Sequence, residues 1–253
     1  DDTLVVASTA TVTISDNPSI SALNAIADKT DGVVTATLAA DSLSNLGALT
    51  TAGTDLITIT VSDNEGDTLT AANLSTLGGK TAGVVTVSNA VDISGTASQL
   101  TAALVTADTL VVAETATANI TDEATTDIDA TVLSAIGAKT SGAITVTNAI
   151  DIAGTADEVT AALVTDDTLV VAETATVTIS DNPSIAELNA IAAKTDGVVT
   201  ATLAADSLSN LGDLTTAGTD LITITVNDGA TDDVTAANLS TLGGKTAGVV
   251  TVS

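Results

Sequence analysis

Two acidic loops are the parts of this sequence whose residue types could do chemistry. Residues 63–67 read DNEGD, and residues 228–233 read DGATDD. Calcium takes six to eight oxygen ligands, and carboxylate-rich loops supply several of them. Neither loop has the EF-hand spacing or the glycine-rich nonapeptide of calcium-binding β-helices. Calcium is the one cofactor that the sequence indicates, and its candidate ligands are Asp63, Glu65, Asp67, Asp228, Asp232 and Asp233. The alternative role of such aspartates is helix N-capping and solubility.

The composition leaves little material for catalysis. The sequence has no His, Cys, Tyr or Arg to act as base, nucleophile or oxyanion partner. A pair of carboxylates could hydrolyse glycosides, but aspartates that recur at the same place in every repeat are typical of a structural role. We therefore predict that the protein is not an enzyme.

A second pattern is a Thr-x-Thr pair, or a near variant, on almost every predicted strand. Stacked strands lie about 4.8 Å apart and alternate residues about 6.7 Å apart, which would give a regular lattice of hydroxyl and methyl groups. Such an array resembles the ice-binding faces of β-solenoid antifreeze proteins. The alternative is that threonine suits any solvent-facing strand. The pairs are Thr11/Thr13, Thr35/Thr37, Thr58/Thr60, Thr86/Ser88, Thr115/Thr117, Thr145/Thr147, Thr176/Thr178, Thr200/Thr202, Thr223/Thr225 and Thr251/Ser253.

The elements that position these residues follow one pattern, which is clearest in residues 19–41, SISALNAIADKTDGVVTATLAAD. In the first half, Ile20, Leu23 and Ile26 have the spacing of an amphipathic helix. The second half, GVVTATLA, alternates as a half-buried strand does, and KTDG forms a turn between the two. A helix–turn–strand unit of this size cannot bury its own apolar faces, so it must stack on similar units.

Similar units recur about every 25 to 30 residues, and residues 166–253 match residues 1–88 with about eleven differences. We predict an α/β fold: a strand–turn–helix solenoid with a parallel β-sheet on one side and short helices on the other. Residues 1–253 would form one continuous solenoid of about ten units, a segment of a longer array. The longer units, such as 96–125, would add a second short strand after a corner. The expected core residues are Val34, Ile57, Ile59 and Val87 on strands and Leu23, Leu46, Leu74 and Leu104 on helices.

Helix ends carry recognisable signals. Residues 96–99, 155–158 and 184–187 have the spacing of a capping box. Each of the five cations follows a predicted helix and precedes a threonine, which favours interaction with the negative end of the helix dipole. The alternative is a row of cations that binds an anionic partner. The five are Lys29, Lys80, Lys139, Lys194 and Lys245.

The formal charge of −27 is the strongest compositional signal. It disfavours nucleic acid and anionic membranes as partners and attracts divalent cations. Salt reduces the self-repulsion of such a chain, so the charge favours an extracellular, saline habitat. No apolar run approaches the roughly 18 residues of a membrane helix, and no signal peptide opens the chain, so we expect no membrane insertion.

Units such as SISALNAIADKTDGVVTATLAAD and SLSNLGALTTAGTDLITITV resemble tandem repeats in very large surface proteins of marine bacteria, including cyanobacteria. The resemblance covers the whole chain and implies a secreted, cell-surface, structural or adhesive role, without site residues. We predict a structural or adhesive segment of an extracellular or cell-surface repeat protein that forms filaments or layers by end-to-end stacking. Its partners would be further copies of itself, surface polysaccharide or other surface proteins. The alternatives are a calcium-binding adhesin module and an ice-binding protein that uses the Thr-x-Thr face.

The stacking argument gives a first prediction. A fragment of two units, residues 19–67, should be largely unfolded because interfaces with neighbouring units carry most of the stability. Circular dichroism of this fragment beside the full chain checks the prediction. Cooperative folding of the fragment alone would contradict it.

Overall fold

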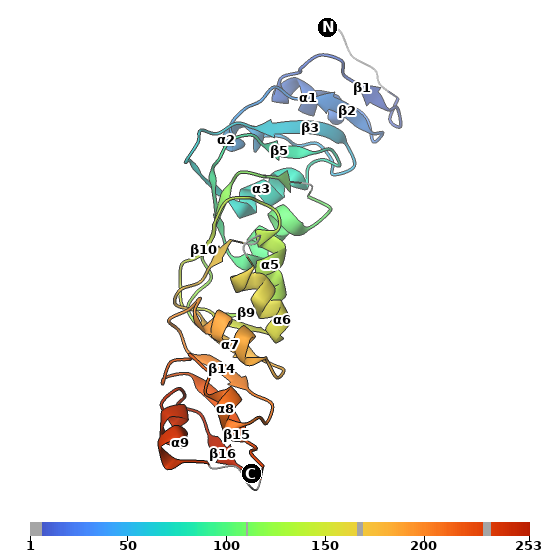
Figure 1. Ribbon diagram of the computed structural model, residues 1–253. Coiled ribbons are helices and arrows are strands. Elements are labelled where there is room, and N and C mark those ends of the chain that lie inside the picture. The colour runs from blue at the N-terminus through green and yellow to red at the C-terminus, as the bar shows by residue number, and fades with distance from the viewer. Residues whose placement is uncertain (1–6, 110, 166–168, 230–233) are drawn as a thin grey trace. The chain divides into compact units, whose positions relative to one another are not determined.

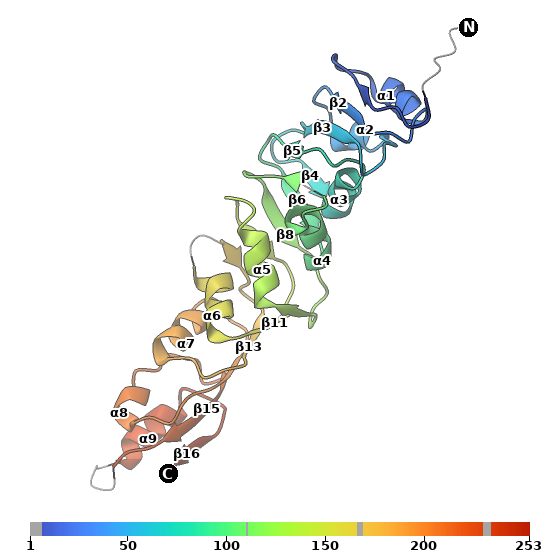
Figure 2. The same ribbon diagram turned by 90° about the vertical axis from the view of Figure 1, so that its right-hand side faces the viewer.

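The computed structural model describes residues 7–109, 111–165, 169–229 and 234–253. Within these ranges the protein is a mixed α/β structure with three parallel sheets and nine α-helices (Figures 1 and 2). The chain divides into two compact units. Unit 1 comprises Asp1–Ile120 and Ala138–Ala143, and unit 2 comprises Thr121–Gly137 and Ile144–Ser253.

Unit 1 contains one complete sheet and three strands of another. The complete sheet has the order β1 (Val12–Thr13), β2 (Val34–Thr37), β3 (Leu56–Val61), β5 (Val85–Val87) and β7 (Val111–Val112). Strands β4 (Thr68–Thr70), β6 (Asp92–Gly95) and β8 (Thr117–Ile120) pair in that order. The helices are α1 (Ile20–Ala27), α2 (Leu43–Leu46), α3 (Ala71–Gly78) and α4 (Ala97–Leu100), and α4 continues into the π-helical segment η1 (Thr101–Val105).

Unit 2 has the same kinds of element. Its larger sheet has the order β9 (Asp127–Asp129), β11 (Asp151–Gly154), β13 (Thr176–Ile179), β14 (Val199–Thr202), β15 (Leu221–Val226) and β16 (Val250–Val252), and β10 (Ile144–Val146) pairs with β12 (Val170–Val171). The helices are α5 (Ala130–Gly137), α6 (Ala156–Val159), α7 (Ile185–Ala192), α8 (Leu208–Leu211) and α9 (Ala236–Gly243); the π-helical segment η2 (Thr160–Val164) follows α6.

The strand register confirms parallel pairing between successive helix–strand layers. Paired residues are 21 positions apart at Thr35 and Leu56 and 26 apart at Ile59 and Val85. The prediction of a single sheet is wrong, because the longer layers place two strands in different sheets. A turn after β5 makes the corner. There the Asn89 side-chain amide donates to the Asp63 carbonyl (2.6 Å), and the chain then enters β6.

The predicted core is confirmed. Val34, Ile57, Ile59 and Val87 are buried on strands, and Leu23, Leu46, Leu74 and Leu104 are buried on helices. Each buried aliphatic side chain contributes about 1.5–3 kcal/mol, and small branched side chains let layers pack at close, regular distances. The three capping boxes are also confirmed, with Thr96–Gln99, Thr155–Glu158 and Ser184–Glu187 exchanging both hydrogen bonds.

A threonine after each lysine fastens one layer to the layer before it. The Thr81 hydroxyl is buried; it accepts from the Ile57 and Gly83 amides (2.8 Å each) and lies 2.8 Å from the Ile57 carbonyl oxygen. A Cβ at Gly83 would overlap that carbonyl, so only glycine permits the approach. We call this Lys-Thr-x-Gly arrangement the threonine clip. It recurs at Thr30, Thr140, Thr195 and Thr246, whose hydroxyls donate to the carbonyls of Ala10, Ala116, Ala175 and Ile222.

The threonine clip gives a second prediction. Thr81→Val keeps the shape of the side chain but leaves the Ile57 and Gly83 amides without their acceptor. The free energy of unfolding should fall by about 1–3 kcal/mol, the cost of unsatisfied buried donors. Urea denaturation, with hydrogen exchange at the Ile57 amide, measures the loss.

The matched control is Thr58→Val, the same change at an exposed position on β3. The control should change stability little and leave exchange at Ile57 unaltered. Equal losses in the two variants would show that the clip is not a special contact.

Candidate functional site

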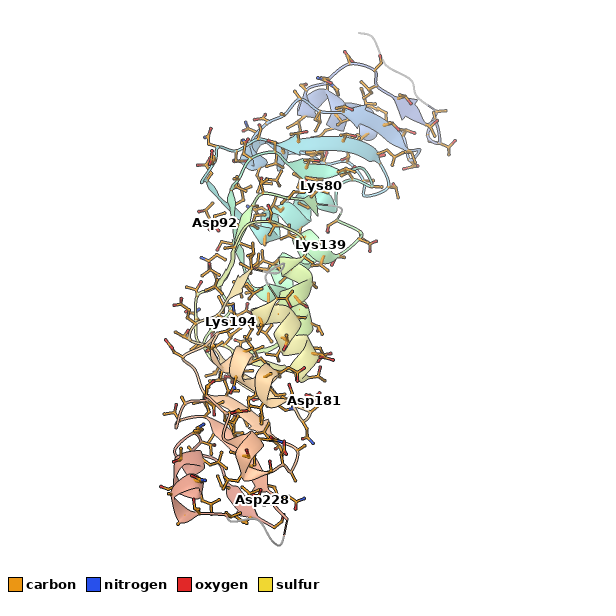
Figure 3. The ribbon with its side chains drawn as sticks, in the orientation of Figure 1. Lys80, Asp92, Lys139, Asp181, Lys194 and Asp228 are labelled. Carbon is orange, nitrogen blue, oxygen red and sulfur yellow. The ribbon has the colours of Figure 1, made fainter. Side chains whose placement is uncertain are left out.

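The acidic loops cap helices across layers. In unit 1, Asp63 Oδ2 accepts from the Leu43 amide (2.7 Å) at the start of α2. In unit 2, Asp228 Oδ2 accepts from the Leu208 amide (3.0 Å) at the start of α8, and Asp181 Oδ1 accepts from the Ala156 amide (2.7 Å); Figure 3 labels both aspartates. A carboxylate at this place satisfies an orphan amide and faces the positive end of the helix. These aspartates therefore connect layers.

The rest of the first loop is held by its own hydrogen bonds. Asp67 Oδ2 accepts from the Asn64 amide (2.8 Å) and side chain (3.2 Å), and Gly66 supplies the positive φ of the turn. Glu65 is exposed. In the described ranges, no three or more His, Cys, Asp or Glu side chains are grouped so that they could hold a metal. Asp232 and Asp233 lie outside the described residues, and calcium at these loops stays a prediction.

Two buried carboxylates were not anticipated from the sequence. Asp55 is 4% exposed; its two oxygens accept from the Val34 amide (2.8 Å) and the Ala52 amide (2.9 Å). Asp220 makes the same contacts in unit 2, with Val199 (2.9 Å) and Ala217 (2.8 Å). A buried carboxylate is tolerated when hydrogen bonds replace its water. The signal for this role is the segment TAGTD, which occurs at 51–55 and at 216–220.

Hydrogen bonds favour the ionised form of two half-buried acids. The side-chain amide of Asn45 and the backbone amide of Ser42, both 2.8 Å away, lower the pKa of Asp41. The side chain and then the backbone amide of Ser184 lower the pKa of Glu187. Both carboxyls are ionised at neutral pH, so neither suits the role of a general acid.

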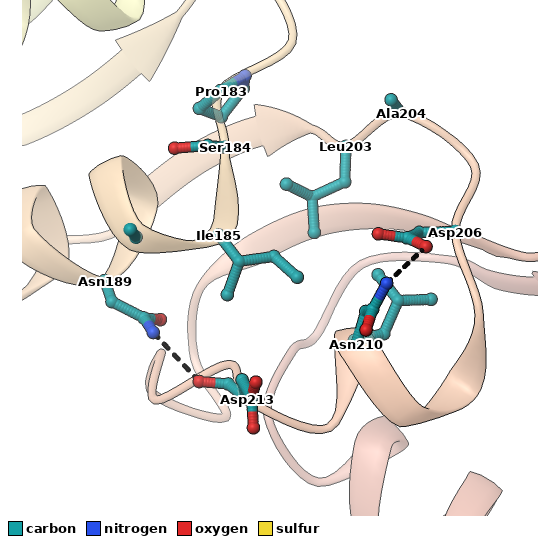
Figure 4. Close-up of a pocket in the computed structure, with 11 residues that line it drawn as sticks. Pro183, Ser184, Ile185, Asn189, Leu203, Ala204, Asp206, Asn210 and Asp213 are labelled. Carbon is teal, nitrogen blue, oxygen red and sulfur yellow. Dashed lines mark hydrogen bonds between the residues drawn. The ribbon is translucent and has the colours of Figure 1, made fainter.

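A cavity of about 490 Å³ lies between α7 and α8 of unit 2 (Figure 4). Ile185 and Leu203 line it beside the polar side chains of Asn189, Asp206 and Asn210. The Asn189 amide donates to the Asp213 carbonyl (2.9 Å) and accepts from the Thr215 amide (2.8 Å), and Asn210 donates to Asp206 (2.9 Å). The side-chain amides that line the cavity thus form hydrogen bonds to neighbouring segments of the protein.

Two lysines donate hydrogen bonds to the C-terminal end of a helix in the neighbouring layer, and not to the helix that they follow. Lys80 Nζ donates to the carbonyl of Gly47 (2.7 Å), which ends α2, although Lys80 itself follows α3. Lys245 Nζ donates in the same way to Gly212 (2.5 Å), which ends α8. Both cations thus lie at a helix C-terminus, but the helix belongs to the neighbouring layer and is not the preceding helix that the sequence predicts.

The threonine lattice is less regular than predicted. Thr37 lies beside Thr58, and Thr60 beside Thr86. Elsewhere the rows are interrupted, because Leu56 lies beside Thr35 and Val112 beside Thr86. Thr117 is in another sheet, beside Asp92. The corners of the longer layers thus divide the pairs among sheets, and a single continuous lattice is not formed. Ice binding stays a prediction for the separate faces.

No protein-family model, no curated protein and no solved structure matches this chain. Among the helices of the described residues, none combines the length and apolar character needed to span a membrane.

The acidic loop gives a third prediction. Calcium should raise the melting temperature more than sodium at equal ionic strength, because the loops and the charge of −27 favour a divalent cation. Asp63→Ala and Glu65→Ala separate capping from binding. In the presence of a chelator, Asp63→Ala should lower the melting temperature because α2 loses its cap, whereas Glu65→Ala should not.

If the loop binds calcium, both variants should also reduce the calcium-dependent increase. Identical responses to calcium and sodium in the unaltered chain would remove the case for a calcium site. Differential scanning calorimetry measures both effects.

Proposed function

We propose that this chain is a structural or adhesive segment of an extracellular or cell-surface repeat protein, built as a continuous solenoid that associates end to end. The observation that carries the proposal is the uniform stacking of layers. Strands pair in parallel at offsets of 21 to 26 residues, and threonine clips fasten one layer to the next. Each layer is stabilised mainly by its interfaces with neighbouring layers. This kind of stability suits an elongated spacer or fibre segment.

The last layer of unit 2 supports association through its apolar side. Val252 is 53% exposed and Val250 is half-buried. Their counterparts at an offset of 165 residues, Val87 and Val85, are 5% and 0% exposed. The corresponding valines are thus buried in unit 1, where β7 lies beside β5, and more exposed in unit 2, where β15 is the only described partner of β16. Covering it in an assembly would recover the hydrophobic stabilisation.

The adhesive role is supported by an uncharged face. On the outward side of this sheet in unit 1, Leu56 of β3 (47% exposed) and Val84, the residue before β5 (46% exposed), lie among threonines. Unit 2 repeats the pattern with Leu221 (46%) and Val249 (65%). In a chain of net charge −27, this face approaches another acidic surface with the least repulsion. Surface polysaccharide and other surface proteins are the partners that we propose for it, in a saline extracellular setting.

End-to-end association gives a fourth prediction. Light scattering should show assembly that strengthens as salt rises, because salt screens repulsion between the acidic chains. Val250→Lys combined with Val252→Lys places charge on the open apolar side of β16 and should abolish the assembly.

Val249→Lys is the matched control, since it adds a lysine at the exposed residue directly before β16. The control should assemble as the unaltered chain does. A chain that stays monomeric at high salt, or a double lysine variant that assembles equally well, would refute end-to-end association.

A further inference from the structure

We propose that a groove between α2 and α3 of unit 1 binds an acidic sugar, a uronate residue of an acidic polysaccharide, with the sugar carboxylate at Lys80. The groove has a volume of about 350 Å³. Sites for small molecules have volumes of about 300–1,000 Å³. Because the groove lies between helices, it is separate from the uncharged sheet face around Leu56 and Val84, and the inference goes beyond the proposed function.

Internal layers of unit 1 form the groove. Helix α3 packs against α2 on one side and against η1 on the other. Leu43 of α2 and Leu77 of α3 are buried and supply the apolar part of the lining. The polar part comes from the same two helices and from Lys80, which follows α3 and is labelled in Figure 3. The shape of the groove is therefore fixed by the packing of adjacent layers.

Lys80 gives the groove its positive charge. The side chain is half-buried, and its Nζ donates to the Gly47 carbonyl (2.7 Å). No carboxylate in the described ranges forms an ion pair with Lys80. An ammonium group has three donors, so two remain for a ligand. In a chain with 32 acidic and five basic residues, a cation without an acidic partner favours a ligand that supplies a carboxylate itself.

The neutral side chains beside Lys80 favour a sugar over an acidic peptide. Ser44 and Asn73 are exposed, and their side chains have no hydrogen-bond partner in the part of the chain that the structure describes. Thr76 Oγ1 donates to the Ala72 carbonyl (2.8 Å), so its oxygen can accept from a ligand hydroxyl. One cation beside several neutral groups matches a ring with one carboxylate and several hydroxyls. An acidic peptide would bring more negative charge than the groove can pair.

The same groove occurs in unit 2, with a volume of about 380 Å³. Every residue that lines the groove of unit 1 has an identical counterpart 165 positions later, and Lys245 corresponds to Lys80. Asp228 also lines the groove of unit 2, whereas its counterpart Asp63 does not line that of unit 1. Because a fixed negative charge repels a carboxylate, the groove of unit 1 should bind the sugar more tightly.

The net charge of −27 opposes the approach of an acidic polymer. At about 0.5 M salt the Debye length is roughly 4–5 Å, so repulsion from distant exposed carboxylates is largely screened. A contact with the half-buried Lys80 is screened much less. Binding is therefore best measured at this salt concentration.

An NMR titration of the full chain with a galacturonate oligomer tests the proposal. The oligomer should shift the backbone amide signals of Ser44, Asn73 and Lys80 to saturation, and a neutral galactose oligomer should not. Asn73→Asp places a carboxylate in the groove at an exposed position, so it should abolish these shifts without lowering the melting temperature.

Lys80→Gln with Lys245→Gln removes both charges but keeps a donor for the helix carbonyls. This pair should weaken binding of the galacturonate oligomer about tenfold, the usual effect of losing a hydrogen bond to a charged group. Lys29→Gln with Lys194→Gln is the matched control, because it removes the same charge at lysines that line neither groove. The control should bind as the unaltered chain does.

No shift with the galacturonate oligomer, equal binding of the neutral oligomer, or equal loss in the two double variants would overturn the proposal. A glutamate oligomer that binds as tightly would assign the groove to acidic peptides and overturn the sugar. None of these outcomes bears on end-to-end association, which light scattering measures separately.

Discussion

The close approach of successive backbones at the threonine clip is the contact on which the rest of the structure depends. Because Gly83 has no Cβ, its backbone lies against the Ile57 carbonyl, and the Thr81 hydroxyl joins the polar groups of both layers. This spacing fixes the parallel register of β3 and β5 and the depth at which Ile59 and Val85 meet. A core without aromatic residues fits the same constraint, since small aliphatic side chains keep the layers close.

Acidity in this chain is compatible with folding because many carboxylates are paired with backbone amides. Asp55 and Asp63 accept hydrogen bonds from backbone amides of the preceding layer. These negatively charged side chains therefore hold adjacent layers together. Lys80 makes a similar contact at the C-terminal end of α2, where its Nζ donates to the Gly47 carbonyl. Among the residues that indicated calcium binding, Asp63, Asp67 and Asp228 thus accept hydrogen bonds that hold helix starts and a turn. The surface that remains distinctive is the uncharged face around Leu56 and Val84.

Local patterns predicted much of this fold, and contacts between layers explain what they missed. The capping box at Thr96 and the burial of Leu23 follow from residues within one turn or strand, so the sequence was sufficient for them. The division into several sheets depends on the turn at Asn89, which bonds to Asp63 26 residues earlier. The partner of Lys80 lies 33 residues away, and the burial of Asp55 depends on Val34. Composition and periodicity carry no information about such pairings.

Because residues 166–253 repeat residues 1–88, the surroundings of corresponding residues can be compared within one chain. Val87 and Val252 follow the same stretch of sequence and pair with corresponding residues, Val61 and Val226, yet Val87 is 5% exposed and Val252 is 53% exposed. In unit 1, strand β7 lies beside β5 and covers this layer, whereas among the described residues only β15 pairs with β16. Hydrophobic stabilisation scales with the area that such a layer removes from water, while repulsion among acidic chains opposes any second chain that would supply it. Under the proposed end-to-end association, the balance of these two terms would make ionic strength the variable that controls assembly, and it would link the acidity of the sequence to the stacking of its units.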